Sequence, residues 1–377
     1  MIRRALTAAV LLLPPATARA DDPPPFEWKS AEPEAHGIRS ADLDAIWSDL
    51  ERRQTVALVI VHRDRLIFER YGPDRDRHWT HSTASTAKAL VGGLGLMLAM
   101  DDGRLQPDDP AGRWIPGWAD DPSHRSITIR HLATHTSGIE DAEEGGKPHD
   151  RLEGWKGDFW KRLPPPLDPF TTARDRAPVL DEPGRRFRYS NPGMAMLAYA
   201  LTAGLREGPD GDLRALLKHR ILEPIGVPER EWSIGYGTTT EVDRLPLVAT
   251  WGGGAYSADA VARVGRLMLR KGDWEGRQLL SARVVEAALK PGTVPGHSGL
   301  GWWVNGGRYG KIWGSAPEDA FGGAGAGQQL LFVVPSLDLI IVRNGQDLDP
   351  SLAFEAGLDR HVIGPIVKAI GAGRKGP

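Results

Sequence analysis

Two periods of hydrophobic and polar residues alternate along this chain. From 40 to 52, apolar side chains recur every three or four positions, which predicts an amphipathic helix. At 55–62 and 66–71 the residues are mostly β-branched, aliphatic or aromatic, and the polar triplet between the two runs predicts a β-hairpin. A strongly apolar stretch, 81–100, follows and predicts a buried helix. The chain therefore begins with a helix, two paired strands and a second helix.

The middle of the chain has the pattern of a mostly helical region. Few strand signals occur between 104 and 244, and helical spacing recurs in three patches, at 128–133, 195–205 and 213–222. Within this region, 140–177 shows little periodicity, contains Trp155 and Trp160, and is long for a structureless loop. We therefore predict a helical domain at 104–244 with a lid-like loop at 140–177. The alternative is that this segment is an ordinary surface loop with no role in a binding site.

After 245 the chain returns to a mixed pattern. Helical spacing occurs at 258–271, 281–289 and 352–370, the last with an expected kink or break at Gly364-Pro365. Short strands are predicted at 300–304, 309–313, 329–334 and 337–343. Strands near both ends, with helices between them, imply one α/β (α+β) domain made of 32–103 and 245–377, into which the helical domain is inserted.

The first twenty residues have the pattern of a secretory signal peptide. Arg3 and Arg4 precede an apolar core, and Ala18-Arg19-Ala20 offers a cleavage site after Ala20. The following residues, 21–31, begin proline-rich and acidic and are expected to form a disordered leader. No later apolar run reaches the roughly 18 residues that span a bilayer. We expect a periplasmic or secreted protein with no membrane span in the mature chain; the choice between Sec and twin-arginine export stays open.

Charge and cysteine content narrow the class of protein further. Residues 1–20 hold three arginines and no acid, so the mature chain would carry 44 lysines and arginines against 49 acids, a net charge of −5. This acidic balance disfavours a nucleic-acid partner. The chain contains no cysteine, so an exported form would depend on core packing rather than on disulfides, which its length allows. The sequence does not indicate the oligomeric state.

Ser85 and Lys88 are the first candidates for chemistry. They form a Ser-x-x-Lys pattern where the apolar stretch 81–100 begins, and residues three apart on a helix share a face, so the amine can lie within hydrogen-bonding distance of the hydroxyl. A serine needs an adjacent base, and burial makes a lysine suitable because it disfavours the charged form. A capping serine beside a solvated lysine is the structural alternative.

Two further motifs are candidates for the same site. In Tyr189-Ser190-Asn191, the tyrosine hydroxyl can carry protons between nucleophile and leaving group, and the asparagine can hold the lysine or a substrate carbonyl. The glycine-rich run 321–328 leads into a predicted strand, and Gly323 and Gly325 would let a substrate carbonyl approach the backbone. A backbone N–H from this edge could form an oxyanion hole with that of the serine. Because the glycines precede a strand rather than a helix, dinucleotide binding is disfavoured.

Two other patterns do not support a different chemistry. His131 and His135 have the i, i+4 spacing of a zinc-binding helix, but the residues between them lack the glutamate that such sites use as a base. The segment 296–300 approaches the Gly-x-Ser-x-Gly elbow of α/β-hydrolases, but Leu300 occupies the last glycine position. We therefore predict neither a metal nor an organic cofactor.

Six motifs follow one another along the chain: Ser85-Thr86-Ala87-Lys88, 132–139, 183–191, 223–226, 253–257 and 301–304. Together they resemble the landmarks of the serine beta-lactamase-related family, which groups class C beta-lactamases with D-alanyl-D-alanine carboxypeptidases, esterases and 6-aminohexanoate-dimer hydrolases. The resemblance runs from about 32 to 370. It implies the beta-lactamase and penicillin-binding-protein architecture, an antiparallel sheet flanked by helices and interrupted by a mostly helical domain.

The resemblance also implies roles for individual residues. Ser85 would be the acylated nucleophile, Lys88 its activating partner, Tyr189 the general base and proton shuttle, and Asn191 their support. Members that bind a substrate carboxylate usually carry Lys-Thr-Gly or His-x-Gly on the strand that lines the site, whereas Gly323-Ala324-Gly325 supplies no cation. Lys311, on the preceding predicted strand, could replace that cation only if its side chain points into the cleft.

We therefore expect an exported serine hydrolase that cleaves a small-molecule ester or amide through an acyl-enzyme. Trp155 and Trp160 would favour apolar acyl or alcohol groups, which need no charge partner. A beta-lactamase or D-Ala-D-Ala peptidase is the first alternative. A non-catalytic relative that binds cell-wall peptide or a partner protein is the second, although such a protein would have no need to keep serine, lysine and tyrosine together. The natural substrate is not indicated.

Overall fold

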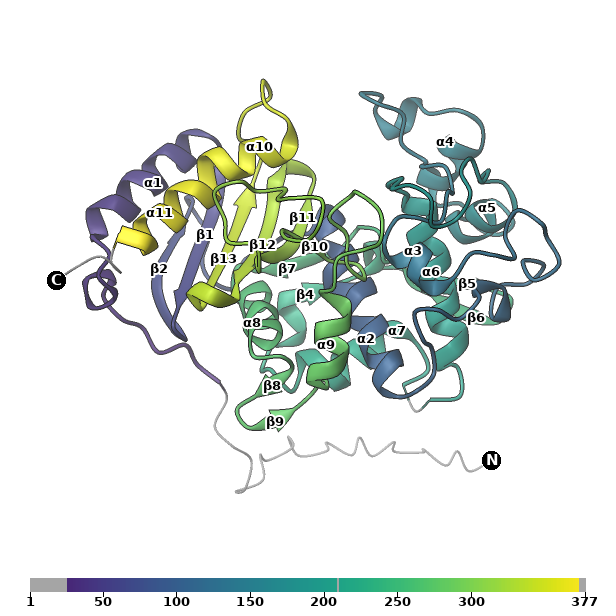
Figure 1. The fold of residues 1–377 in the computed structure, drawn as a ribbon, viewed down its shortest axis with the longest axis horizontal. Helices are drawn as coiled ribbons and strands as arrows, with labels where there is room; N and C mark the ends of the chain where they lie inside the picture. Colours follow the sequence, from purple (N-terminus) through teal and green to yellow (C-terminus); the bar gives the residue numbers. More distant parts are fainter. Residues whose placement is uncertain (1–25, 209, 373–377) are drawn as a thin grey trace, which may run out of the picture.

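The centre of the fold is a six-stranded antiparallel sheet in the order β10–β11–β12–β13–β1–β2 (Figure 1). The computed structural model describes residues 26–208 and 210–372, so the predicted signal peptide, 1–20, lies outside the described residues. β1 (Thr55–His62) pairs with β2 (Arg65–Tyr71) as the predicted hairpin, and on its other side with β13 (Leu339–Gly345). The sheet thus joins distant parts of the chain.

Helices cover both faces of this sheet: α1 (Ser40–Arg52) and α11 (Gly364–Ala372) on one face, and α8 (Ala258–Leu269) on the other. Side chains alternate along β1. Leu58 and Ile60 are therefore buried on the face covered by α1 and α11, and Val59 and Val61 on the face covered by α8. The chain closes with α10 (Phe354–Leu358), a π-helical turn and α11 in succession. The kink or break expected near Gly364 is therefore a π-helical turn that ends at Ile363.

The glycine-rich edge of the sheet differs from the predicted elements. The spacing predicted no strand within the glycine-rich run 321–328, but its first residues form β11 (Phe321–Gly325), which pairs with β12 (Gln329–Val334) and β10 (Trp303–Val304). The strand predicted at 309–313 is absent from the structure. There the Asn305 side chain accepts from the backbone N–H of Trp313 and donates to backbone carbonyls, so this loop is held by an amide rather than by a neighbouring strand.

Part of the predicted disordered leader, 21–31, is ordered. The backbone of Ala31 donates to the carbonyl of Leu66, and Leu66 donates back to Lys29. Trp28 is buried, and its indole N–H donates to Asp259 at 2.8 Å. Residues 26–31 therefore belong to the folded body, because an aromatic side chain and backbone hydrogen bonds tie them to it.

Most of the regular structure in 104–244, the range predicted as a helical domain, is helical. Its helices are α3 (Ile129–Ala133), α4 (Gly154–Lys161), α5 (Pro169–Asp175), α6 (Asn191–Leu205) and α7 (Leu213–Leu217). It also contributes β4 (Trp232–Ser233) to a small sheet in which β7 (Ala255–Ser257) is central and β3 (Thr80–Ser82) is the other edge. The boundary predicted between 244 and 245 falls inside a hairpin of β5 (Thr240–Val242) and β6 (Leu245–Leu247). After this hairpin the chain also forms β8 (Asp273–Trp274), β9 (Arg277–Gln278) and α9 (Ala282–Ala288).

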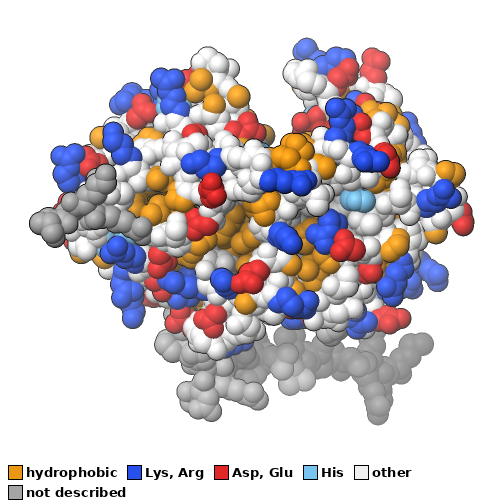
Figure 2. All heavy atoms as spheres, viewed as in Figure 1, with side chains coloured by type: hydrophobic (Ala, Val, Ile, Leu, Met, Phe, Trp, Pro, Cys, Tyr) orange, Lys and Arg blue, Asp and Glu red, His pale blue; other side chains and the backbone are white. Residues whose placement is uncertain are grey.

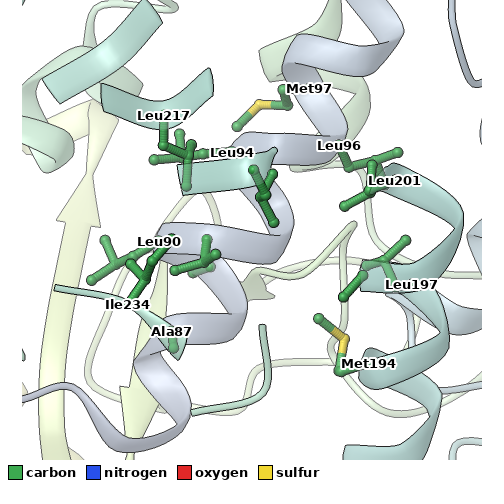
Figure 3. Close-up of a cluster of buried hydrophobic side chains, with 14 of the residues drawn as sticks. Ala87, Leu90, Leu94, Leu96, Met97, Met194, Leu197, Leu201, Leu217 and Ile234 are labelled. Carbon is green, nitrogen blue, oxygen red and sulfur yellow. The ribbon is translucent and has the colours of Figure 1, made fainter. Parts of the chain in front are cut away.

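The apolar stretch that begins at 87 forms the middle of the core. It runs through a π-helical turn into α2 (Leu94–Asp101) and packs along α6 (Figure 3). Leu90 and Leu94 are fully buried, as are Leu197 and Leu201 of α6. Gly92 lies at this contact, where a Cβ would come within 2.8 Å of the Met194 methyl group and would displace that side chain. None of the helices in the described residues combines the length and the apolar character needed to cross a membrane.

Candidate active site

Ser85 and Lys88 lie at the start of this buried helical stretch. Ser85 is in a 3-10 turn, Ala84–Thr86, and Lys88 begins the π-helical turn Lys88–Gly93 that continues into α2. Single π-helical turns occur frequently at functional sites. The Nζ atom of Lys88 lies 3.1 Å from the Oγ atom of Ser85. The structure thus brings amine and hydroxyl into contact, rather than leaving the lysine in solvent.

The Lys88 amine is buried among oxygen atoms. The residue is 5% exposed, and Nζ donates to the side-chain oxygen of Asn191 and to the backbone carbonyl of Trp251, both at 2.8 Å. Burial lowers the pKa of Lys88 to about 7, although the nearby carboxylates of Asp141 and Glu143 act in the opposite direction. A neutral amine has two hydrogens and one lone pair. With both hydrogens directed to carbonyl oxygens, the lone pair is left for the Ser85 hydroxyl.

Tyr189 contacts the same serine. Its hydroxyl donates to Oγ of Ser85 at 2.8 Å, and the Lys88 amine lies 4.6 Å from the centroid of its ring. Burial raises the pKa of Tyr189, so the phenol is protonated at neutral pH. This protonation state favours Lys88 as the base that activates Ser85 and leaves Tyr189 as a proton donor. It differs from the general-base role that the resemblance implies for Tyr189.

Asn191 is held in place by a residue that the sequence did not reveal. One carboxylate oxygen of Asp141 accepts from the backbone N–H of Asn191 at 2.8 Å and from its side-chain amide at 3.0 Å. The amide nitrogen therefore faces Asp141, and the amide oxygen faces Lys88. Burial raises the pKa of Asp141, while the hydrogen bonds from Asn191 oppose that rise. No local pattern marks Asp141, which belongs to an aperiodic stretch.

His135 supports the tyrosine segment and is not placed as a metal ligand. Its Nδ1 accepts from the backbone N–H of Ser190 at 3.2 Å, and its ring lies against that of Tyr189, with centroids 4.6 Å apart. Burial lowers the pKa of His135 to about 3, so the ring is neutral. His131 instead closes the capping box of α3 with Thr128. Among the described residues, no group of three or more acidic, histidine or cysteine side chains could hold a metal ion.

The two glycines predicted to bind substrate face the turn that carries Ser85 and the start of the following helix. A Cβ on Gly325 would lie 2.6 Å from the carbonyl oxygen of Thr83 and 2.7 Å from the nitrogen of Ser85. A Cβ on Gly323 would lie 3.0 Å from Ala89. At Gly325 these contacts are with backbone atoms, so glycine is required there for β11 to pack directly against the start of the helix, whereas a Cβ at Gly323 would be tight but not excluded. This packing brings the edge of β11 beside the Ser85 backbone N–H, where an oxyanion hole would form.

A cavity of about 370 Å³ opens in front of Ser85. It is lined by Ser85, Glu143, Phe187, Tyr189, Trp303, Ile312, Trp313, Ala324, Gly325, Ala326, Phe354 and Glu355. Phe354 and Glu355 belong to α10, whereas Glu143 belongs to the segment that precedes α4. The surface of the molecule is hollowed between the parts that carry α10 and α4 (Figure 2). The site is thus a cleft between the sheet region and the helical region.

A sequence model of the beta-lactamase family matches residues 43–362. The chain belongs to the beta-lactamase family. It is 26% identical over 391 residues to a 6-aminohexanoate-dimer hydrolase from Paenarthrobacter ureafaciens, a match that covers 96% of this chain and 89% of that protein. It is 30% identical over 228 residues to esterase EstB from Burkholderia gladioli, over 56% of this chain and 54% of that protein.

A solved structure shares the same fold at low sequence identity. A penicillin-binding protein homologue from Caulobacter crescentus superposes with a TM-score of 0.62 and 16% identity, covering 87% of this chain and 98% of that one. The predicted fold class, a mixed helix and antiparallel sheet architecture of the beta-lactamase type, is confirmed. The chain is a hydrolase of the serine beta-lactamase family.

The remaining predicted residues lie outside the cavity of this beta-lactamase family member. Trp155 and Trp160 are partly buried against the core and do not line it. The segment expected as a lid-like loop contains α4 and α5, and both tryptophans belong to α4. Lys311 donates to the backbone carbonyls of Gly314 and Ala316, at 2.7 and 2.9 Å, and does not line the cavity either. The cavity is lined instead by aromatic residues that include Trp313 and Phe354, which belong to none of the six motifs.

Proposed function

We propose that this protein is an exported serine hydrolase that cleaves esters or amides through an acyl-enzyme on Ser85. The observation that carries the proposal is the double contact of the Ser85 hydroxyl, 3.1 Å from the Lys88 amine and 2.8 Å from the Tyr189 hydroxyl. A non-catalytic binding protein would not require a buried amine beside a serine. Export is inferred from residues 1–20, whose pattern is that of a cleavable signal peptide.

In the proposed reaction, Oγ of Ser85 attacks the substrate carbonyl carbon while its proton passes to the neutral Lys88 amine. The negative charge on the carbonyl oxygen is stabilised by the N–H of Ser85 and an N–H from the β11 edge. The bond to the leaving group breaks, and Tyr189 supplies the proton that the leaving group needs. The proton held by Lys88 then restores the tyrosine. Water attacks the acyl-enzyme in the reverse sequence of proton transfers and releases the acid.

The cavity lining favours ester and amide substrates that lack a carboxylate. Among the described residues that line the 370 Å³ cavity, none is a lysine or arginine, and Lys311 is engaged with backbone carbonyls. Placing a carboxylate in a partly desolvated cleft without a partner is costly. A beta-lactamase or D-Ala-D-Ala peptidase acts on substrates with that group, so these alternatives are less well supported.

Short-chain p-nitrophenyl esters are expected to be hydrolysed with a kcat/KM about 10²-fold or more above that for a chromogenic cephalosporin. The reason is that the cephalosporin carboxylate would enter the cavity without a charged hydrogen-bond partner. Steady-state kinetics of the mature protein measure this ratio. Ser85→Ala should abolish both ester turnover and labelling by a fluorophosphonate. Ser82→Ala, an exposed serine three positions earlier, should retain them. Efficient cephalosporin hydrolysis with esters untouched would contradict the proposed substrate class.

The pH dependence of kcat/KM should report the ionisation of Lys88. Its pKa is lowered by burial to about 7, and only the neutral amine can accept the Ser85 proton. Activity is therefore expected to fall about tenfold per pH unit below this value and to level off above it. A pH profile with a neutral p-nitrophenyl ester, corrected for spontaneous hydrolysis, measures the midpoint. A flat profile between pH 5 and 9 would remove Lys88 as the base.

A further inference from the structure

Two carboxylates lie on opposite walls of the Ser85 cavity. Glu143 comes from the segment before α4, and Glu355 comes from α10. The cavity contains no lysine or arginine among its described lining residues. The Lys88 amine, which contacts Ser85, is buried and is the base of the proposed reaction. The electrostatic character of the space that a substrate would occupy is therefore negative.

The wall that carries Glu143 is held by the helical region. The indole N–H of Trp160 donates to the carbonyl of Ala142 at 3.1 Å, immediately before Glu143 in the chain. His149 stacks on the ring of Trp160, and its Nε2 lies 3.6 Å from the Glu143 carboxylate. Trp160 therefore contributes to the site by fixing the backbone next to an acid, although its ring does not line the cavity.

The wall that carries Glu355 is held in a similar way. The side chain of Gln328, 3% exposed, donates to the carbonyl of Phe354 at 2.7 Å and accepts from the backbone N–H of Leu348 at 2.6 Å. This fixes the backbone immediately before Glu355. No hydrogen bond or ion pair joins the Glu355 carboxylate to another of the described residues. Its charge is thus available to a group bound in the cavity.

Aromatic side chains complete the lining. Phe187, Trp303, Trp313 and Phe354 line the same cavity as the two acids. Aromatic rings attract cations through their electron-rich faces, and ammonium groups are commonly recognised by aromatic residues together with carboxylates. An anionic group would meet only repulsion and desolvation on these walls. Carboxylates and aromatic rings are separate features of the lining, and both favour the same kind of ligand.

We propose that this cavity selects substrates that carry a positively charged ammonium group on the part of the ester or amide that lies between Glu143 and Glu355. The inference rests on the proposed function, because it assigns the substrate class of the same Ser85 site. Glu355 is the principal specificity-determining residue, since its carboxylate has no partner within the described residues. Glu143 adds to the negative potential from the opposite wall.

Three p-nitrophenyl esters of equal chain length test the proposal. The cationic ester is 6-(trimethylammonio)hexanoate, the neutral one is its carbon isostere 7,7-dimethyloctanoate, and the anionic one is the monoester of heptanedioate. At pH 8.5, where Lys88 is neutral, kcat/KM should be about tenfold higher for the cationic than for the neutral ester, and about tenfold lower for the anionic ester. The cation preference should shrink as ionic strength rises, because salt screens the carboxylates.

Variants assign the preference to the two acids. Glu355→Gln should lower the ratio of kcat/KM between the cationic and neutral esters several-fold, and Glu355→Gln combined with Glu143→Gln should bring it close to one. Glu51→Gln is the matched control, since Glu51 is exposed on α1, outside the cavity. That variant should keep the full ratio.

A binding measurement makes the result independent of turnover. The Ser85→Ala variant, titrated calorimetrically, should bind hexyltrimethylammonium at least tenfold more tightly than hexanoate, and Glu355→Gln should remove most of that difference. Equal kcat/KM for the three esters, or a preference that survives in the double variant, would overturn the inference while leaving the serine hydrolase intact. If the wild-type protein hydrolysed none of the esters, but Ser85→Ala still bound the ammonium ligand, the proposed function would be overturned and the cation site would remain supported.

Discussion

Lys88→Met is expected to lower kcat/KM for p-nitrophenyl esters by about 10³-fold or more while leaving the protein folded. Methionine keeps an unbranched chain of similar length but removes the amine that accepts the Ser85 proton. General base catalysis contributes about 10²–10⁴-fold, and Lys88 is the group whose lowered pKa, about 7, suits that task. Tyr189 cannot replace it, because burial raises the pKa of the phenol and keeps it protonated.

The stability of the Lys88→Met variant reflects two opposing effects. Removing a buried amine relieves a desolvation penalty, but it leaves the carbonyl oxygens of Asn191 and Trp251 without their donor. We expect these effects to offset one another, so that the thermal unfolding midpoint shifts by no more than about 5 °C. The residual activity should also lose the ionisation near pH 7. Activity within tenfold of the wild type, in a folded variant, would show that another group acts as base.

The local patterns that predicted this fold are those in which side-chain spacing alone decides the structure. The helix expected at 40–52 is α1, and the hairpin expected at 55–62 and 66–71 is β1 and β2. In these segments the apolar spacing and the turn residues agree with the tertiary contacts. The Ser85–Lys88 contact is of the same kind, since a spacing of three residues sets it within one helical turn.

The parts that could not be predicted depend on contacts between distant segments. β11 consists largely of glycine, which has low strand propensity, so its strand state comes from pairing with β12 and from close packing against the Ser85 turn. Asp141 acts through Asn191, and no spacing rule links the two residues. Trp160 was predicted to contact substrate from its residue type alone. Its ring does not line the cavity, and its indole N–H instead holds the backbone of Ala142, next to Glu143.

Glu143 connects substrate selection with catalysis. Its carboxylate lines the cavity, and its charge also raises the pKa of Lys88 against the effect of burial. Neutralising Glu143 therefore acts on two properties at once: it removes negative potential from the cavity, and it favours the neutral form of the base. A substrate ammonium bound nearby would act in the same direction on Lys88. A cationic substrate would thus help to keep its own catalytic base deprotonated.

Tyr189→Phe is expected to lower kcat/KM for an ethyl ester by about 10²-fold or more, but for the p-nitrophenyl ester of the same acid by less than about tenfold. The reason is the leaving group. Ethoxide is strongly basic and needs a proton as the bond breaks, whereas p-nitrophenolate is stable as an anion at neutral pH. Since Tyr189 is held protonated with its hydroxyl 2.8 Å from Ser85 Oγ, its loss should matter where a proton must be donated.

This comparison separates the two roles that Tyr189 could have. If Tyr189 were the base that activates Ser85, as the family resemblance implies, its removal would slow the attack on both esters equally, because both require the same deprotonated serine. The two rates are measured by steady-state hydrolysis with matched acyl groups, and the fluorophosphonate labelling rate of Ser85 gives a third, leaving-group-independent measure of serine activation. Equal losses for both esters, together with slower labelling, would assign the base to Tyr189 and leave Lys88 as an electrostatic support. A loss confined to the ethyl ester, with labelling nearly unchanged, is the outcome that the buried phenol and the lowered Lys88 pKa predict.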